Sequence, residues 1–210
     1  APSQPKVAEN KSGIPELNDL LPSIKLPPMP RSAPLVARRP RTFAGATMET
    51  FDEINLVSKN FQAVNQTLDV WRLLDVTGMN NENVIAGRRK QIITWIEHYV
   101  AFKTTVERAH TAYAERLRQI NTPAEKLNST IRRFRERRDR TYGPTLKSSA
   151  INAQINTAAE SALRILEENF TGWRLDGTGQ QILFNDPRVA AAFSRAIGQL
   201  NQATARLKAG

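Results

Sequence analysis

The chain has 210 residues, of which 40% are hydrophobic, and this length suits one ordinary domain together with a tail. Lysine and arginine total 30 against 20 acidic residues, and the net charge of +10 favours an anionic partner such as nucleic acid, a lipid surface or an acidic protein. The absence of cysteine excludes disulfides, zinc–thiolate sites, iron–sulfur clusters and cysteine nucleophiles.

Residues 1–46 are predicted to form a proline-rich extended arm, because they hold nine of the twelve prolines. We expect either a leader without fixed structure or an arm that becomes ordered on a partner or on its own bundle. The apolar side chains that would make such contacts include Leu20, Leu21, Ile24 and Leu26. A small basic cluster just before the first helix consists of Arg38, Arg39 and Arg41.

The chain begins at Ala1 rather than at a methionine, which fits either a mature chain after export or removal of an initiator methionine before a small residue. The compartment stays open, and an exported, periplasmic or processed virion or assembly component is favoured over a cytoplasmic one. No apolar run approaches the roughly 18 residues of a membrane span, and no signal-peptide core is present.

The first two helices are predicted from apolar residues that recur at steps of three and four. One helix is expected to begin at Thr47 as N-cap and to end near Gly78. The second, from Asn83 to Asn121, is the longest uninterrupted run, and it would form a rod of about 58 Å. Its coiled-coil-like seam comprises Ile92, Trp95, Tyr99, Phe102, Val106, Ala109 and Tyr113.

Three more helices are predicted in the second half. Thr122, Pro123 and Glu125 match a capping box with proline at the first position, and Gly143–Pro144 is expected to end that helix. Another helix is expected over about 146–170, and the last begins at Asp186–Pro187. Between them, a turn signal at 176–179 permits a short β-hairpin near 173–184. The predicted fold is therefore all-α, an elongated up-down bundle of about five helices over residues 47–210.

The densest charge cluster in the chain consists of Arg132, Arg133, Arg135, Arg137, Arg138 and Arg140. Three interpretations remain open for it: a solvated helix end with salt bridges, a docking surface for an acidic protein, and a grip on the phosphates of nucleic acid or lipid. The first interpretation expects ion pairs at four-residue spacing, which are Arg132–Glu136, Arg135–Asp139 and Glu136–Arg140.

Catalytic and metal-binding patterns are weak. Glu107 and His110 have the spacing of a carboxylate-bridged di-iron ligand pair, but the second pair that such a site needs is missing. We therefore expect no cofactor and no metal site, and no enzyme activity.

The favoured hypothesis is a non-enzymatic structural or adaptor subunit of a larger assembly, with other protein subunits as partners, an acidic surface among them, and possible oligomerisation. The alternative is a nucleic-acid-associated protein that binds phosphates through the arginine-rich helix end, Arg38–Arg41 and Arg88–Lys90.

Overall fold

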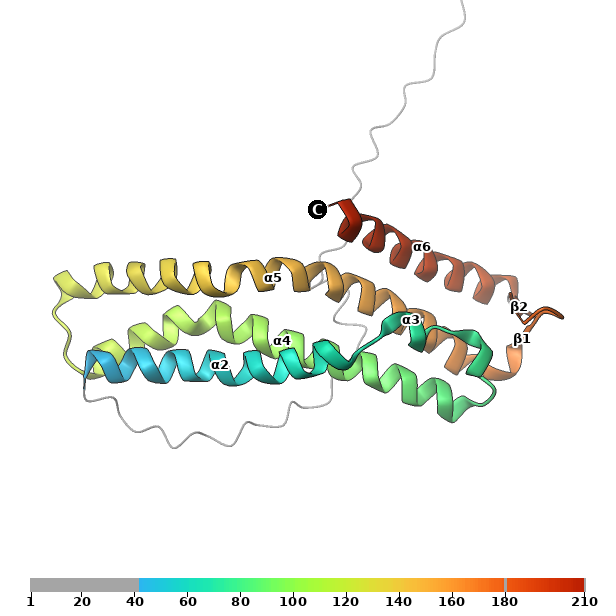
Figure 1. The fold of residues 1–210 in the computed structure, drawn as a ribbon, viewed down its shortest axis with the longest axis horizontal. Coiled ribbons are helices and arrows are strands. Elements are labelled where there is room, and N and C mark those ends of the chain that lie inside the picture. The colour runs from blue at the N-terminus through green and yellow to red at the C-terminus, as the bar shows by residue number, and fades with distance from the viewer. Residues whose placement is uncertain (1–41, 180, 210) are drawn as a thin grey trace, which may run out of the picture.

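The computed structural model describes residues 42–179 and 181–209, and within them the protein is an all-α bundle with one small hairpin (Figure 1). The predicted fold class is therefore confirmed. The long helices are α2 (Phe43–Thr67), α4 (Glu82–Gln119), α5 (Ala124–Glu168) and α6 (Pro187–Ala209). Short elements complete the chain: α3 (Val70–Leu73), the 3₁₀ turns Val76–Gly78 and Phe170–Gly172, and the strands β1 (Trp173–Leu175) and β2 (Ile182–Phe184).

Two long antiparallel helices, α4 and α5, form the axis of the molecule, and the other two long helices cover different parts of it. α2 packs along α4, and α6 packs along the second half of α5 (Figure 1). The start of α2 lies at one end of the molecule, and the α2–α3 junction lies near its middle. The bundle is elongated because α4 and α5 have 38 and 45 residues, several times the usual helix length.

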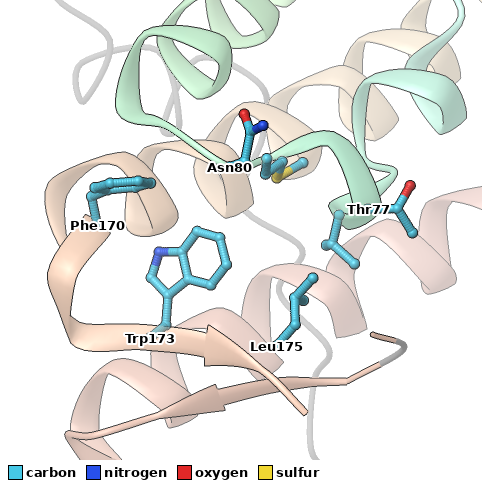
Figure 2. Close-up of a pocket in the computed structure, with 7 residues that line it drawn as sticks. Thr77, Asn80, Phe170, Trp173 and Leu175 are labelled. Carbon is cyan, nitrogen blue, oxygen red and sulfur yellow. The ribbon is translucent and has the colours of Figure 1, made fainter. Parts of the chain in front are cut away.

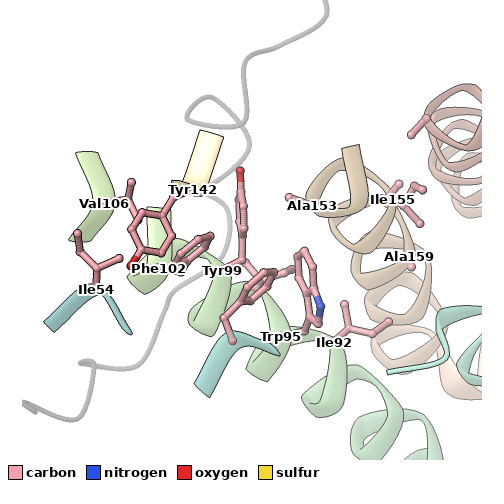
Figure 3. Packing of buried hydrophobic residues seen from close by; sticks show 14 of the residues in the cluster. Ile54, Ile92, Trp95, Tyr99, Phe102, Val106, Tyr142, Ala153, Ile155 and Ala159 are labelled. Carbon is pink, nitrogen blue, oxygen red and sulfur yellow. The ribbon is translucent and has the colours of Figure 1, made fainter. Parts of the chain in front are cut away.

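The core follows the predicted seam of α4, since all seven seam residues are buried. Aromatic rings dominate its centre. Phe61 of α2 stacks on Phe102 at 5.3 Å between ring centroids. Trp95 stacks on Tyr99 at 5.5 Å (Figure 3). Small residues of α5 such as Ala153 and Ala159 are fully or almost fully buried, which lets the helices approach closely.

The first helix begins earlier and ends earlier than the sequence predicted. Its N-cap is Thr42, which accepts a hydrogen bond from the Gly45 amide, and not Thr47. It ends at Thr67 rather than near Gly78, because two aspartates cap new short turns. Asp69 accepts from the Arg72 amide and Asp75 accepts from the Thr77 amide.

The predicted break at Gly143–Pro144 is wrong, since α5 runs unbroken from Ala124 to Glu168 with Pro144 inside it. The predicted capping box is also wrong. The Thr122 hydroxyl donates backwards to the Leu117 carbonyl, and Asn121 adopts a positive φ of 53°. Together with backbone hydrogen bonds from Asn121 to Arg118 and from Thr122 to Leu117, this is a helix C-terminal motif that ends α4.

The hairpin and the last helix are confirmed. β1 and β2 pair antiparallel, with Trp173 opposite Phe184. Asp186 accepts a hydrogen bond from the Arg188 amide, and Pro187 occupies the first position of α6.

Candidate partner-binding surface

The six predicted arginines lie on the first half of α5, where the structure divides them into two groups. Arg137 and Arg138 contact neighbouring helices, although the Arg137 side chain is itself exposed. The other four side chains, called here the arginine face, are exposed, and they are Arg132, Arg133, Arg135 and Arg140. At 100° per residue these four occupy an arc of about 160° centred opposite the buried Phe134.

Arg138 fastens α5 to α4. Its side chain is only 13% exposed, and its Nη1 lies 3.2 Å from Nδ1 of His110 and 3.4 Å from the carbonyl oxygens of Val106 and Glu107. Its Nη2 lies 2.6 Å from Asp139 on the same helix. Arg138 therefore stabilises the packing of α5 on α4. His110, which the sequence analysis considered as a metal ligand together with Glu107, contacts this arginine.

Arg137 fastens α5 to α2. Its guanidinium carbon lies 4.8 Å from the centre of the Phe51 ring, within the range of a cation–π contact. Phe51 also packs against Phe134 at 5.1 Å between ring centroids. The two anchored arginines thus hold the first half of α5 against both neighbours, so the arginine face stands on a well-supported helix.

The three predicted four-residue ion pairs do not form. Asp139 pairs with Arg138 instead, and Glu136 makes no ion pair among the described residues. Within this part of the chain, no side chain of the arginine face makes a hydrogen bond or an ion pair. Two acids lie on the same surface, Glu136 and Asp139, so four unpaired guanidinium groups dominate its charge.

Aromatic residues are not available on this face. Phe134 and Tyr142, which the sequence places beside the arginines, are 5% and 7% exposed. Tyr142 donates a 2.8 Å hydrogen bond to Oδ1 of Asn55 in α2. Because both rings face the bundle interior, the surface offers no ring on which a nucleic-acid base would stack.

The second basic cluster of the sequence is used within the fold. Arg88 donates to the carbonyl oxygens of Leu73 and Asp75 and so holds the segment between α3 and α4. Arg89 lies 2.8 Å from both Glu160 and Glu167 of α5. These charges are already neutralised or hydrogen-bonded, which leaves Lys90 as the exposed member of the cluster.

Ion pairs between helices are the feature that sequence reasoning missed. Arg116 of α4 pairs with Glu49 and Glu53 of α2, and Arg89 pairs with the buried Glu160. The partners are 63 to 78 positions apart in the chain. The one available signal was Glu160 itself, the single acid of the stretch 146–166, which is rich in small and apolar residues.

A cavity of about 300 Å³ lies between the loop that precedes α4 and strand β1 (Figure 2). Trp173, Phe170 and Leu175 line one side of it, and Thr77 and Asn80 lie on the other. It contains no charged or nucleophilic pair that would support catalysis. Over residues 42–179 and 181–209, no group of three or more His, Cys, Asp or Glu is placed to hold a metal ion.

None of the helices in these ranges is both long enough and apolar enough to cross a membrane. The remaining predicted contact residues lie outside the described residues, and they are Leu20, Leu21, Ile24, Leu26, Arg38, Arg39 and Arg41. Comparison with protein-family models, with curated proteins and with solved structures finds no match for this chain.

Proposed function

We propose that this protein is a non-enzymatic adaptor or structural subunit of a larger assembly, and that its arginine face binds an acidic surface of a partner protein. The tether in this proposal lies before Thr42, because residues 43–46 of the predicted arm belong to α2, and all nine prolines of the arm precede that helix. Elongated helical bundles are well suited to such a role, because they present long side surfaces at fixed spacing.

One observation carries the proposal: four exposed arginines on one face of α5 make no ion pair with the described residues. A helix end that needed only solubility would gain from the four-residue pairs that the sequence offers, and these pairs are not formed. Unpaired guanidinium groups on a supported helix bind carboxylates through bidentate hydrogen bonds at a small cost in side-chain ordering.

The burial of Phe134 and Tyr142 favours a protein partner over nucleic acid. Binding of single strands relies on exposed rings as well as on positive charge, and this face offers only the charge. Arg88 and Arg89, which would extend a phosphate-binding track, are engaged inside the bundle. Nucleic-acid binding therefore becomes the outcome that the experiment must exclude.

The test replaces the whole arginine face with glutamine in the full chain. A matched control removes the same number of charges from exposed arginines elsewhere, at Arg72, Arg108, Arg118 and Arg195. The probes are an acidic polypeptide, polyglutamate, and a duplex DNA of equal charge, each titrated over a range of salt concentrations.

We expect the polypeptide to bind the parent and the control variant, and to bind the arginine-face variant at least about tenfold more weakly, equivalent to about 1.4 kcal/mol. Circular dichroism of all three proteins should be the same. Submicromolar binding of the parent to DNA, with a steep salt dependence that flattens only in the arginine-face variant, would instead establish the phosphate-binding alternative.

A further inference from the structure

A second cavity, of about 320 Å³, lies near the middle of the molecule and is called here the central groove. The ends of α2 and α6, together with α3, meet α4 and α5 around it. Its apolar lining includes Leu68, Trp71, Trp95, Ile155 and Leu207. Trp71 is 52% exposed and Leu207 is 44% exposed, so large apolar side chains at its edge lie open to solvent.

Side-chain amides line the same groove. Asn65 accepts a 2.9 Å hydrogen bond from the Trp95 indole, but its Nδ2 donates to no other described residue. The side chains of Asn152 and Asn156 make no hydrogen bond within the described part of the chain, although Asn156 is only 4% exposed. Among the described residues, the one fully buried side-chain atom without a hydrogen-bond partner is Oε1 of Glu97, so the amides of this groove reach solvent and are available as donors to an incoming segment.

We propose that the central groove binds the segment Leu26–Pro30 of the same chain. That segment reads Leu-Pro-Pro-Met-Pro, a sequence that favours the polyproline II conformation. Its carbonyl groups have no internal hydrogen-bond partners in this conformation and so suit amide donors such as Asn152 and Asn156. Grooves lined by aromatic residues bind such segments because little conformational entropy is lost.

The length of the chain allows this contact. α2 has 25 residues, so its far end, where the groove lies, is about 37 Å from Phe43. Pro28 lies 14 positions before Thr42, and 14 residues of extended chain span about 43–46 Å. Because the segment and the groove belong to one chain, this contact is intramolecular, and its strength does not depend on the protein concentration.

This inference does not depend on the proposed function, and it leaves residues 1–25 for the tether. The test uses the full chain, which has no cysteine, so that two cysteines can be introduced without competition. One variant combines Met29→Cys with Lys208→Cys at the groove. The control combines Met29→Cys with Lys59→Cys, an exposed position on α2 that is closer to Thr42 but outside the groove. A short bis-maleimide then crosslinks the two thiols.

If the arm does not bind the groove, Met29→Cys should crosslink to Lys59→Cys at least as often as to Lys208→Cys, because the distance from Thr42 to Lys59 is shorter. We expect the opposite, with intramolecular crosslinking to Lys208→Cys exceeding the control at least about fivefold. Adding Trp71→Ala should reduce that yield to the control level while helicity is retained. The proposal is overturned if the two cysteine pairs give equal yields or if Trp71→Ala has no effect. It is also overturned if crosslinked dimers are the main product, because the groove would then bind the segment of a second copy of the chain.

Discussion

Arg89 of α4 lies 2.8 Å from the carboxylate of Glu160 in α5, a side chain that is only 2% exposed. Glu167 accepts a second hydrogen bond from the same guanidinium group. Burial lowers the pKa of Arg89, but the hydrogen bonds to Glu167 and Glu160 outweigh this effect and raise it above the usual value. The ion pair therefore joins the two axial helices through a carboxylate that is almost fully buried, whereas the Arg89 side chain is 26% exposed.

We expect Arg89→Met to destabilise the protein by about 2–4 kcal/mol, because it leaves the Glu160 carboxylate buried without its main partner. Urea unfolding measures this loss. The double variant Arg89→Met/Glu160→Leu should recover at least half of it, since an apolar pair needs no charge compensation. A double variant that is no more stable than the single one would mean that Glu160 is not the source of the loss.

Phe102 and Lys103 are adjacent on α4, yet they should differ sharply in their contribution to stability. Phe102 is fully buried against Phe61, and Phe102→Ala should cost about 3–5 kcal/mol through lost contacts and the remaining cavity. Lys103 makes only an exposed 3.9 Å pair with Glu107, so Lys103→Ala should cost less than about 0.5 kcal/mol. Similar thermal unfolding of the two variants would contradict this assignment of the buried face.

Apolar spacing was sufficient to predict the fold class and the α4 seam, because burial of a long stripe such as Ile92 to Tyr113 requires little information from distant residues. The ends of helices were harder to predict. Thr122 has the sequence features of an N-cap, but its hydroxyl bonds to Leu117, and only the three-dimensional path of the chain selects between the two uses. The same limit applies to the arginines, since Arg137 and Arg138 differ from Arg140 only in the neighbours they meet.

Pro144 shows how packing overrides local preference. An interior proline costs a helix about 3 kcal/mol relative to alanine, because it removes the hydrogen bond to the carbonyl four residues earlier. α5 nevertheless continues through Pro144. Before the proline, the hydrogen bond from Tyr142 to Asn55 stabilises the helix on α2, and after it, the buried stretch from Ala153 to Leu166 packs in the core.

Pro144→Ala should therefore stabilise the protein by about 1–3 kcal/mol, the helical gain being partly offset by a more flexible unfolded chain. Pro144 is exposed, so the change leaves the core intact. Pro187→Ala is the matched control. Proline is favourable at the first position of α6, and no gain is expected there. Thermal unfolding that shows no gain for Pro144→Ala would support the break in α5 that the sequence alone predicted.

Tyr99 should make the bundle sensitive to alkaline pH. Burial raises the pKa of its phenol, and the nearby negative charge of Glu107 raises it further. In the unfolded chain a tyrosine loses its proton near pH 10, whereas in the folded protein Tyr99 keeps its proton to a higher pH. The unfolded state thus binds fewer protons above about pH 10, so the free energy of unfolding falls as the pH rises, while below about pH 9 this group has no effect.

Tyr99→Phe removes the ionisable group and retains the ring that packs on Trp95 and Phe61. Urea unfolding between about pH 8 and pH 11 should show similar stability of the parent and Tyr99→Phe at the lower end and a shallower decline for the variant above about pH 10. Tyr142→Phe provides the comparison. Burial also raises the pKa of the Tyr142 phenol, and the charge of Arg137 partly opposes this shift. The Tyr142→Phe variant loses the hydrogen bond to Asn55, so it should be about 1 kcal/mol less stable than the parent even at pH 8. Parallel stability curves for the parent and Tyr99→Phe across the alkaline range would show that the Tyr99 phenol reaches solvent in the folded protein.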